Sequence, residues 1–305
     1  MSGASIVLLM MLQTARQEED RTSDLSYRWR MASIVFGIFT SCLSGLVLCF
    51  LREPSCLTTR SENMGLGAVA EEARHLVRFL KIPTFCIMII QGIFGTVPWI
   101  VMSNYMPLYF KFLRLRDWEV SLISAMLHVA MIFGNILGGL FADALTLQFG
   151  CCGRPLTAQI TVVLGIPLTD LIFNSLPVNG TSFETYICLI ATFGLLASWA
   201  QSGTNFPVLS HIAPPSSRSR VMAWEMAFEN SVAAAMGSFL LPHLAAKFGL
   251  ELYSGVTEDT SRDPASLGRA MTSMICIPWV VTFLVYSLMH WTYPHDVGVE
   301  QAFIP

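Results

Sequence analysis

The sequence predicts an all-α membrane protein with about seven transmembrane helices. Only 13 % of the 305 residues are charged, which is about half the share found in an average soluble domain. Hydrophobic residues make up 53 % of the chain, and the mean hydropathy is +0.57. Long apolar stretches recur along the chain and are the third observation. Together these features exclude an ordinary soluble enzyme, a disordered chain and a basic nucleic-acid-binding protein.

Seven apolar stretches are long enough to cross a bilayer as helices. A hydrocarbon core about 30 Å thick requires about 20 helical residues, because backbone groups in lipid are satisfied only within the helix. The predicted spans are Ala32–Leu51, Pro83–Tyr109, Val120–Ala142, Leu156–Leu176, Thr185–Ile212, Val221–Leu244 and Ala270–Trp291.

The longest polar connection near the start of the chain is Arg52–Lys81. Its five Lys and Arg residues favour the cytoplasmic side, although the basic residues of the other connections balance them and leave the orientation open. Ala68–Leu80 carries charged residues at helical spacing, so we expect a surface helix there. Asn179 opens an Asn-Gly-Thr glycosylation sequon, which this arrangement places outside the cell or in a lumen.

Motifs for enzyme chemistry are missing from the sequence. The chain has no Gly-x-Ser-x-Gly, no P-loop, no His-Glu-x-x-His and no dinucleotide fingerprint. The eight cysteines show neither zinc-ligand spacing nor a disulfide framework. The sequence therefore predicts neither an enzyme nor a bound metal or cofactor.

Two groups of residues in the spans indicate function. Gly134, Gly138 and Gly139 lie at a spacing that lets another helix approach closely, and Asp143 at the following helix end can pair with Arg154. Glu225 and Glu229 lie four residues apart on one helix face, where like charges repel. This pair suits a carboxylate that takes up a proton during coupled transport. The alternative is a solvated Glu225 near the cytoplasmic end, paired with Arg218 or Arg220.

Several motifs resemble those of one transporter superfamily. Gly138-Gly139-Leu140-Phe141-Ala142-Asp143 followed by Gly153-Arg154 is similar to the cytoplasmic loop signature of the major facilitator superfamily. A second set resembles its plant and protist branch, which is akin to the spinster-like transporters. This set comprises Gln91-Gly92, Pro98-Trp99, Ser198-Trp199, Thr204-Asn205, Pro207 and Phe228-Glu229.

The resemblance implies a partial transporter. It aligns the seven spans with the sixth to twelfth helices of a twelve-helix protein, so that the first five helices are missing. The implied organisation is a lead-in at 1–31, the last helix of the N-terminal half at 32–51, a cytoplasmic inter-domain loop at 52–81, a six-helix C-terminal half at 82–291 and a cytoplasmic tail at 292–305.

The resemblance also places the second and fifth spans at a central cavity. The substrate-binding candidates are Gln91, Trp99, Asn104, Trp199 and Asn205, and the coupling or gating candidates are Asp143, Arg154, Glu225 and Glu229. Polar side chains in lipid also form hydrogen bonds between helices, and this packing role is the alternative for each candidate in the cavity.

The function that the resemblance implies is transport of a small organic solute by alternating access, with proton coupling as one form of it. One alternative is a transport-incompetent scaffold or regulatory membrane protein derived from a transporter, and a seven-helix receptor is another. The expected partners are the bilayer, a small organic solute or amphiphilic lipid, and a separate N-terminal transporter half, but no nucleic acid. The expected location is the plasma membrane or an organelle membrane.

Overall fold

The computed structural model describes residues 24–50, 66–177, 182–215, 217–250 and 263–301. Regular structure in these residues is helical throughout. Contacts divide the chain into two units, Met1–His75 and Leu76–Pro305. The first unit holds α2 (Asp24–Phe50), and α3 (Leu66–Phe79) runs across the division between the units. The predicted surface helix is therefore confirmed.

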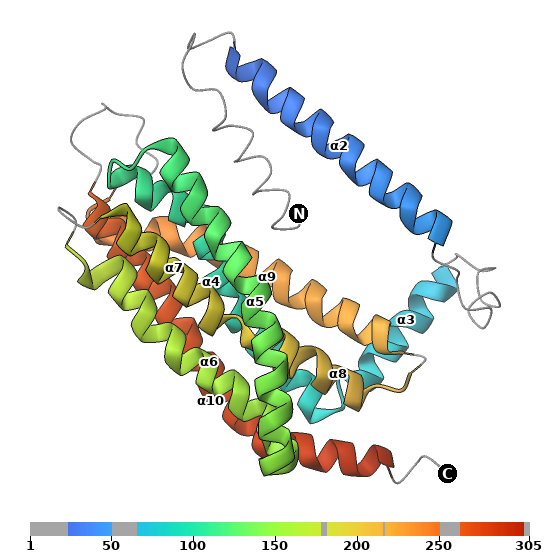
Figure 1. The fold of residues 1–305 in the computed structure, drawn as a ribbon. Helices are drawn as coiled ribbons and strands as arrows, with labels where there is room; N and C mark the ends of the chain where they lie inside the picture. Colours follow the sequence, from blue (N-terminus) through green and yellow to red (C-terminus); the bar gives the residue numbers. More distant parts are fainter. Residues whose placement is uncertain (1–23, 51–65, 178–181, 216, 251–262, 302–305) are drawn as a thin grey trace. The chain divides into compact units, whose positions relative to one another are not determined.

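The second unit is a helical bundle (Figure 1). Its elements are α4 (Pro83–Phe112), α5 (Asp117–Phe149), the 3-10 turn η2 (Gly150–Cys152), α6 (Gly153–Asp170), the π-helical turn η3 (Leu171–Ser175), α7 (Phe183–Ala197), the π-helical turn η4 (Gln201–Asn205), α8 (Phe206–Ile212), α9 (Arg218–Lys247) and α10 (Pro264–Gln301). Helix α4 packs against α9 and α10, α5 packs against α7, and α6 packs against α10.

The all-α membrane fold is confirmed. Stretches of the described chain that are long and apolar enough to cross a membrane are Ser33–Phe50, Pro83–Phe112, Asp117–Ser175, Phe183–Ile212 and Pro264–Val297. The third of these, 59 residues long, contains both α5 and α6 and so covers two predicted spans. The predicted span in α9 does not reach this apolar composition, because Glu225, Glu229 and Asn230 interrupt it.

The helix boundaries follow from local capping. Helix α5 begins after Arg116, whose backbone N–H donates to Glu119 Oε2 at 2.7 Å. Helix α7 begins after Ser182, whose hydroxyl accepts from the backbone N–H of Thr185 at 3.4 Å. Side chains in these positions satisfy donors that the first helical turn leaves open. Helix α10 runs on to Gln301, past the predicted end of its span at Trp291.

Glycines determine how closely α5 approaches its neighbour. A Cβ atom at Gly134 would lie 2.3 Å from Ser198 Oγ, and one at Gly138 would lie 2.5 Å from Trp199 Cβ. Any side chain at these positions would force the helices apart. Gly139 has no atom within 4 Å of such a position. Two of the three glycines predicted for close approach therefore make it.

Aromatic rings fill the bundle where α4, η3 and α7 meet. Tyr109 contacts Phe110 and Phe173 with ring centroids 5.5 and 5.0 Å apart, and Phe110 contacts Tyr186 at 5.2 Å. All these pairs meet edge to face, the geometry that the ring quadrupoles favour. This cluster packs α4 against η3 and α7 at one end of the bundle.

Helix α10 begins after Asp263, whose side chain caps its first turn. Asp263 accepts from the backbone N–H groups of Ala265 and Ser266 at 3.1 Å each, and it also accepts from the Ser266 hydroxyl. Pro264 occupies the first helical position. A backbone N–H there has no partner within the helix, so the missing N–H of proline costs no hydrogen bond. The Ser266 hydroxyl bond, followed by the backbone N–H bonds and the charge of Arg269, lowers the pKa of Asp263 below its ordinary value.

We expect Asp263→Ala to lower the free energy of unfolding by about 1 kcal/mol, the typical value for loss of a helix cap. Because the pKa of Asp263 is lowered in the folded state, its stabilisation is present above the pKa of the unfolded chain, about 4, and disappears as the pH falls through the folded value. Thermal unfolding of the purified protein in detergent at a series of pH values measures both effects. A variant as stable as the parent at neutral pH would contradict the capping role.

Candidate functional site

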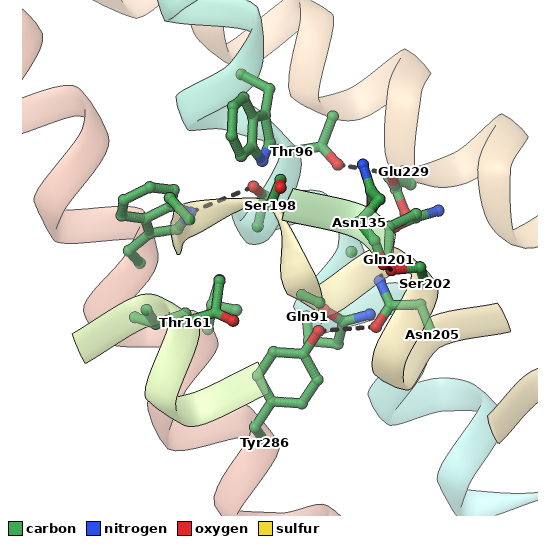
Figure 2. Close-up of a pocket in the computed structure, with 18 of the residues that line it drawn as sticks. Gln91, Thr96, Asn135, Thr161, Ser198, Gln201, Ser202, Asn205, Glu229 and Tyr286 are labelled. Carbon is green, nitrogen blue, oxygen red and sulfur yellow. Dashed lines mark hydrogen bonds between the residues drawn. The ribbon is translucent and has the colours of Figure 1, made fainter. Parts of the chain in front are cut away.

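A cavity of about 530 Å³ lies inside the second unit. Its wall is formed by residues from α4, α5, α6, η4, α9 and α10, and Figure 2 shows how the labelled side chains converge on it. Its polar and charged lining residues are Gln91, Thr96, Asn135, Thr161, Ser198, Gln201, Ser202, Asn205, Glu229, Thr282 and Tyr286. The cavity has the size and the mixed lining of small-molecule sites in proteins.

A break in the helix that follows α7 brings polar groups to this cavity. Pro207 has no N–H to donate, so it cannot bond the carbonyl of Gly203 four residues earlier. Around that carbonyl the chain widens into η4, a π-helical turn of the kind often found at functional sites. The turn carries Gln201, Ser202 and Asn205 into the cavity wall.

Arg154 replaces the hydrogen bond that Pro207 removes. Its Nη1 donates to the Gly203 carbonyl at 2.9 Å, while its Nη2 donates to Asp143 Oδ1 at 3.1 Å. The Arg154 side chain is 13 % exposed and that of Asp143 is 67 % exposed. The predicted pair is therefore present in the structure, with an added contact of the arginine to the backbone of η4. The gating role of the pair stays a prediction.

The polar wall is linked by hydrogen bonds. Tyr286 donates its hydroxyl to Asn205 Oδ1 at 2.8 Å, and Asn205 Nδ2 donates to Gln201 Oε1 at 3.0 Å. Gln91 on α4 lies nearby and is 1 % exposed. Figure 2 shows the tyrosine, the asparagine and Gln91 facing one another. These bonds orient the amides of η4 at the cavity.

Three aromatic rings form another part of the site. Phe193 stacks on Trp279 with centroids 5.7 Å apart, and Trp99 meets Trp279 edge to face at 6.3 Å. The Trp279 ring fits against Gly165, where a Cβ atom would lie 2.3 Å from ring atom Cζ3. Trp279 Nε1 donates to the carbonyl of Gly95 at 3.4 Å. Trp99 and Trp279 line the cavity directly.

The two glutamates of α9 are both buried. Glu225 is 0 % exposed and Glu229 is 6 % exposed. Glu229 Oε1 accepts from Thr96 Oγ1 at 2.6 Å, whereas Glu229 Oε2 and both oxygens of Glu225 have no hydrogen-bond partner in the described chain. The alternative of a solvated Glu225 is therefore wrong. Arg218, one partner considered for it, donates from Nε to the Ala213 carbonyl.

The structure brings together only part of the predicted site. Gln91, Trp99, Asn205 and Glu229 line the cavity. Asn104 is exposed on α4 and does not line it. Trp199 donates from Nε1 to the Leu195 carbonyl at 2.7 Å and packs on Phe141 instead. Asn179 lies outside the described residues.

Sequence reasoning did not select Tyr286 and Trp279 of α10. Both line the cavity, and their seven-residue separation places them on one helix face. Asn135 and Thr161 were also missed, and each is a polar residue within an apolar run. The polarity of Asn135 and Thr161 within apolar spans could have identified them. The seven-residue spacing of the two aromatic residues could have identified Trp279 and Tyr286.

Small residues in α2 form a further pattern that the sequence analysis did not use. Ser33, Gly37, Ser41, Gly45 and Cys49 recur every four residues. No residue of the Ser33–Phe50 stretch is buried in the described structure. Close packing of membrane helices uses such spacing of small residues.

The comparisons with known proteins give one family. The family model described as ion channel regulatory protein UNC-93 matches residues 1–188. No curated protein sequence matches the chain. The prediction of a spinster-like major facilitator transporter, matched over helices six to twelve, was therefore wrong, because the match is to a different family. The regulatory alternative fits that family better than solute transport does.

We expect Arg154 and Asp143 to differ in their effect on stability. Arg154→Met leaves the Gly203 carbonyl without its donor inside the bundle, at a cost of about 1–3 kcal/mol. Asp143→Asn changes only an exposed pair and should cost about 0.5 kcal/mol or less. Thermal unfolding of both variants in detergent makes the comparison. Equal losses would show that the backbone contact of Arg154 contributes nothing beyond the ion pair.

Proposed function

We propose that this chain, which belongs to the UNC-93 family of ion channel regulatory proteins, regulates an ion channel by binding it within the membrane through α2. The chain is an integral multi-pass membrane protein, and the matched residues 1–188 include all of α2. The observation that carries the proposal is the stripe of small residues Ser33, Gly37, Ser41, Gly45 and Cys49, called the small-residue stripe below.

The small-residue stripe suits a helix as its partner. Lipid tails are as apolar as leucine, so helices in a bilayer associate mainly through close packing rather than through the hydrophobic effect. Small residues four apart let two backbones approach closely, in crossings that are commonly right-handed. A channel offers transmembrane helices for such contact.

Two hydroxyl groups near the middle of α2, those of Thr40 and Ser41, form hydrogen bonds within the helix. Ser41 Oγ donates to the Gly37 carbonyl at 2.8 Å, and Thr40 Oγ1 lies 3.0 Å from the carbonyls of Phe36 and Gly37. These groups therefore need no polar partner when another helix covers them. Packing, rather than a buried polar network, is the interaction that this face supports.

The other side of α2 carries large apolar side chains. Val35, Phe39 and Leu43 follow each other at four-residue spacing and are 42, 59 and 51 % exposed. Such side chains suit contact with lipid. The contrast between the two faces provides a matched control.

We expect Gly37→Leu combined with Gly45→Leu to abolish regulation, because two added side chains prevent close approach at the small-residue stripe. Val35→Leu combined with Leu43→Phe adds bulk to the opposite face and should leave regulation intact. Ion channels of the same organism are expressed one at a time with the chain, and their currents are recorded with each variant.

A photo-crosslinking residue at position 37 identifies the contact, with position 39 as its control. Cross-linking to a channel whose current the chain alters would support the proposal. It would be overturned by a cross-link from position 37 to residues 76–305 of the same chain, since the small-residue stripe would then pack internally. Currents unaffected by the parent chain in every channel that it cross-links would also overturn it.

A further inference from the structure

The cavity of the second unit is lined by an acidic side chain, Glu229, that has no basic partner in the described chain. Glu229 is the one acidic or basic residue among those that line the cavity. Ion pairs among the described residues include those of His75 with Glu71, Lys111 with Asp117, Arg154 with Asp143 and His295 with Asp296. Neither Glu225 nor Glu229 takes part in them. A buried carboxylate without a partner is costly, and a second one nearby adds repulsion.

Both carboxylates face the same bare stretch of α4. A Cβ atom at Gly92 would lie 2.7 Å from Glu229 Oε2 and 3.3 Å from Glu225 Oε1. These are two of the three glutamate oxygens that have no hydrogen-bond partner. The missing side chain of Gly92 therefore lets both carboxyl groups pack directly against α4, and Glu229 also lines the cavity.

The neighbouring wall is suited to a cation. Gly92, Thr96 and Trp99 lie at helical spacing on one face of α4, so the indole follows one turn after the threonine that bonds Glu229. Trp99 and Trp279 both line the cavity. Indole rings attract ammonium groups through their negative faces, most strongly where water is excluded. Figure 2 shows the amide and hydroxyl side chains that line the same cavity.

We infer that this cavity binds a small organic ammonium ion, with Glu229 as its counterion and Trp99 and Trp279 as its aromatic wall. Glu225 lies one turn away from Glu229, and its carboxyl group packs against the same glycine of α4. A cavity of about 530 Å³ accommodates a molecule larger than an inorganic ion, with room for an aromatic or alkyl body beside the ammonium group. The inference concerns the second unit and is independent of the role proposed for α2.

The test uses three probes of similar shape and different charge. They are 2-phenylethylamine, which is a cation at neutral pH, the neutral 2-phenylethanol and the anion 3-phenylpropionate. Binding to the full-length protein in detergent is measured by isothermal titration calorimetry and by the shift in thermal unfolding. We expect the amine to bind and to raise the unfolding temperature, and the alcohol and the anion to bind about tenfold more weakly or not at all.

Glu229→Gln keeps the shape of the side chain and removes its charge. We expect it to weaken amine binding by about tenfold or more and to leave binding of the alcohol unchanged. Glu184→Gln is the matched control, because Glu184 is exposed in the first turn of α7 and does not line the cavity. Trp279→Phe should weaken amine binding by a smaller factor.

Three outcomes would overturn the inference. The first is equal affinity of the parent protein for the amine and the alcohol, a result that requires no variant. The second is unchanged amine binding by Glu229→Gln. The third is that sodium or potassium chloride alone raises the unfolding temperature and the amine does not raise it further. That result would assign the carboxylates to an inorganic cation.

Discussion

The structure depends on one constraint, which is that backbone carbonyls and N–H groups inside a membrane must find partners within the protein. Long helices meet it within themselves, and at a proline a side chain of another helix can supply the missing donor. Arg154 does so at the Gly203 carbonyl. Pro242 is a second example, because the Tyr105 hydroxyl donates at 3.4 Å to the carbonyl of Ser238, four residues earlier. At these two prolines the open carbonyl is therefore tied to a side chain from a different helix.

This constraint links the fold to the cavity. The π-helical turn η4 carries Gln201 and Asn205 into the cavity only because the backbone is widened there, and the widening is stable because Arg154 donates into it. The polar wall therefore depends on Arg154, although the Arg154 side chain does not itself line the cavity. A site of this kind is assembled by the packing of helices, since no single helix holds more than a few of its groups.

The sequence predicts the positions of the helices, but it predicts only part of the cavity lining. Apolar length and the cost of unpaired backbone groups act locally along the chain, so each predicted span overlaps an observed helical segment, although the one in α9 falls short of the apolar composition of the others. Gln91, Trp99 and Asn205 line the cavity, whereas Trp199 packs on Phe141 of α5 and Asn104 is exposed. The direction of these side chains depends on where neighbouring helices lie, and Gly138 provides the gap that Trp199 fills. No local pattern contains that information.

The family assignment failed for a related physical reason. Closely spaced glycines, an aspartate at a helix end and an arginine after it solve a packing problem that any bundle of membrane helices meets. The observed pair of Asp143 and Arg154 shows that the physical interpretation of those residues was sound, while the family inferred from them was not. Motifs of this type describe how helices are joined and do not by themselves identify a lineage.

The position of Trp279 has a mechanical consequence. Its ring lies in the space beside Gly165 of α6, stacks on Phe193 of α7 and donates to the backbone of α4. One side chain of α10 is thus in contact with three other helices. Helix α10 cannot slide or rotate past one of them without disturbing its contacts with the other two. Any change in the width of the cavity would therefore require a concerted displacement of several helices, because Trp279 is in contact with all of them.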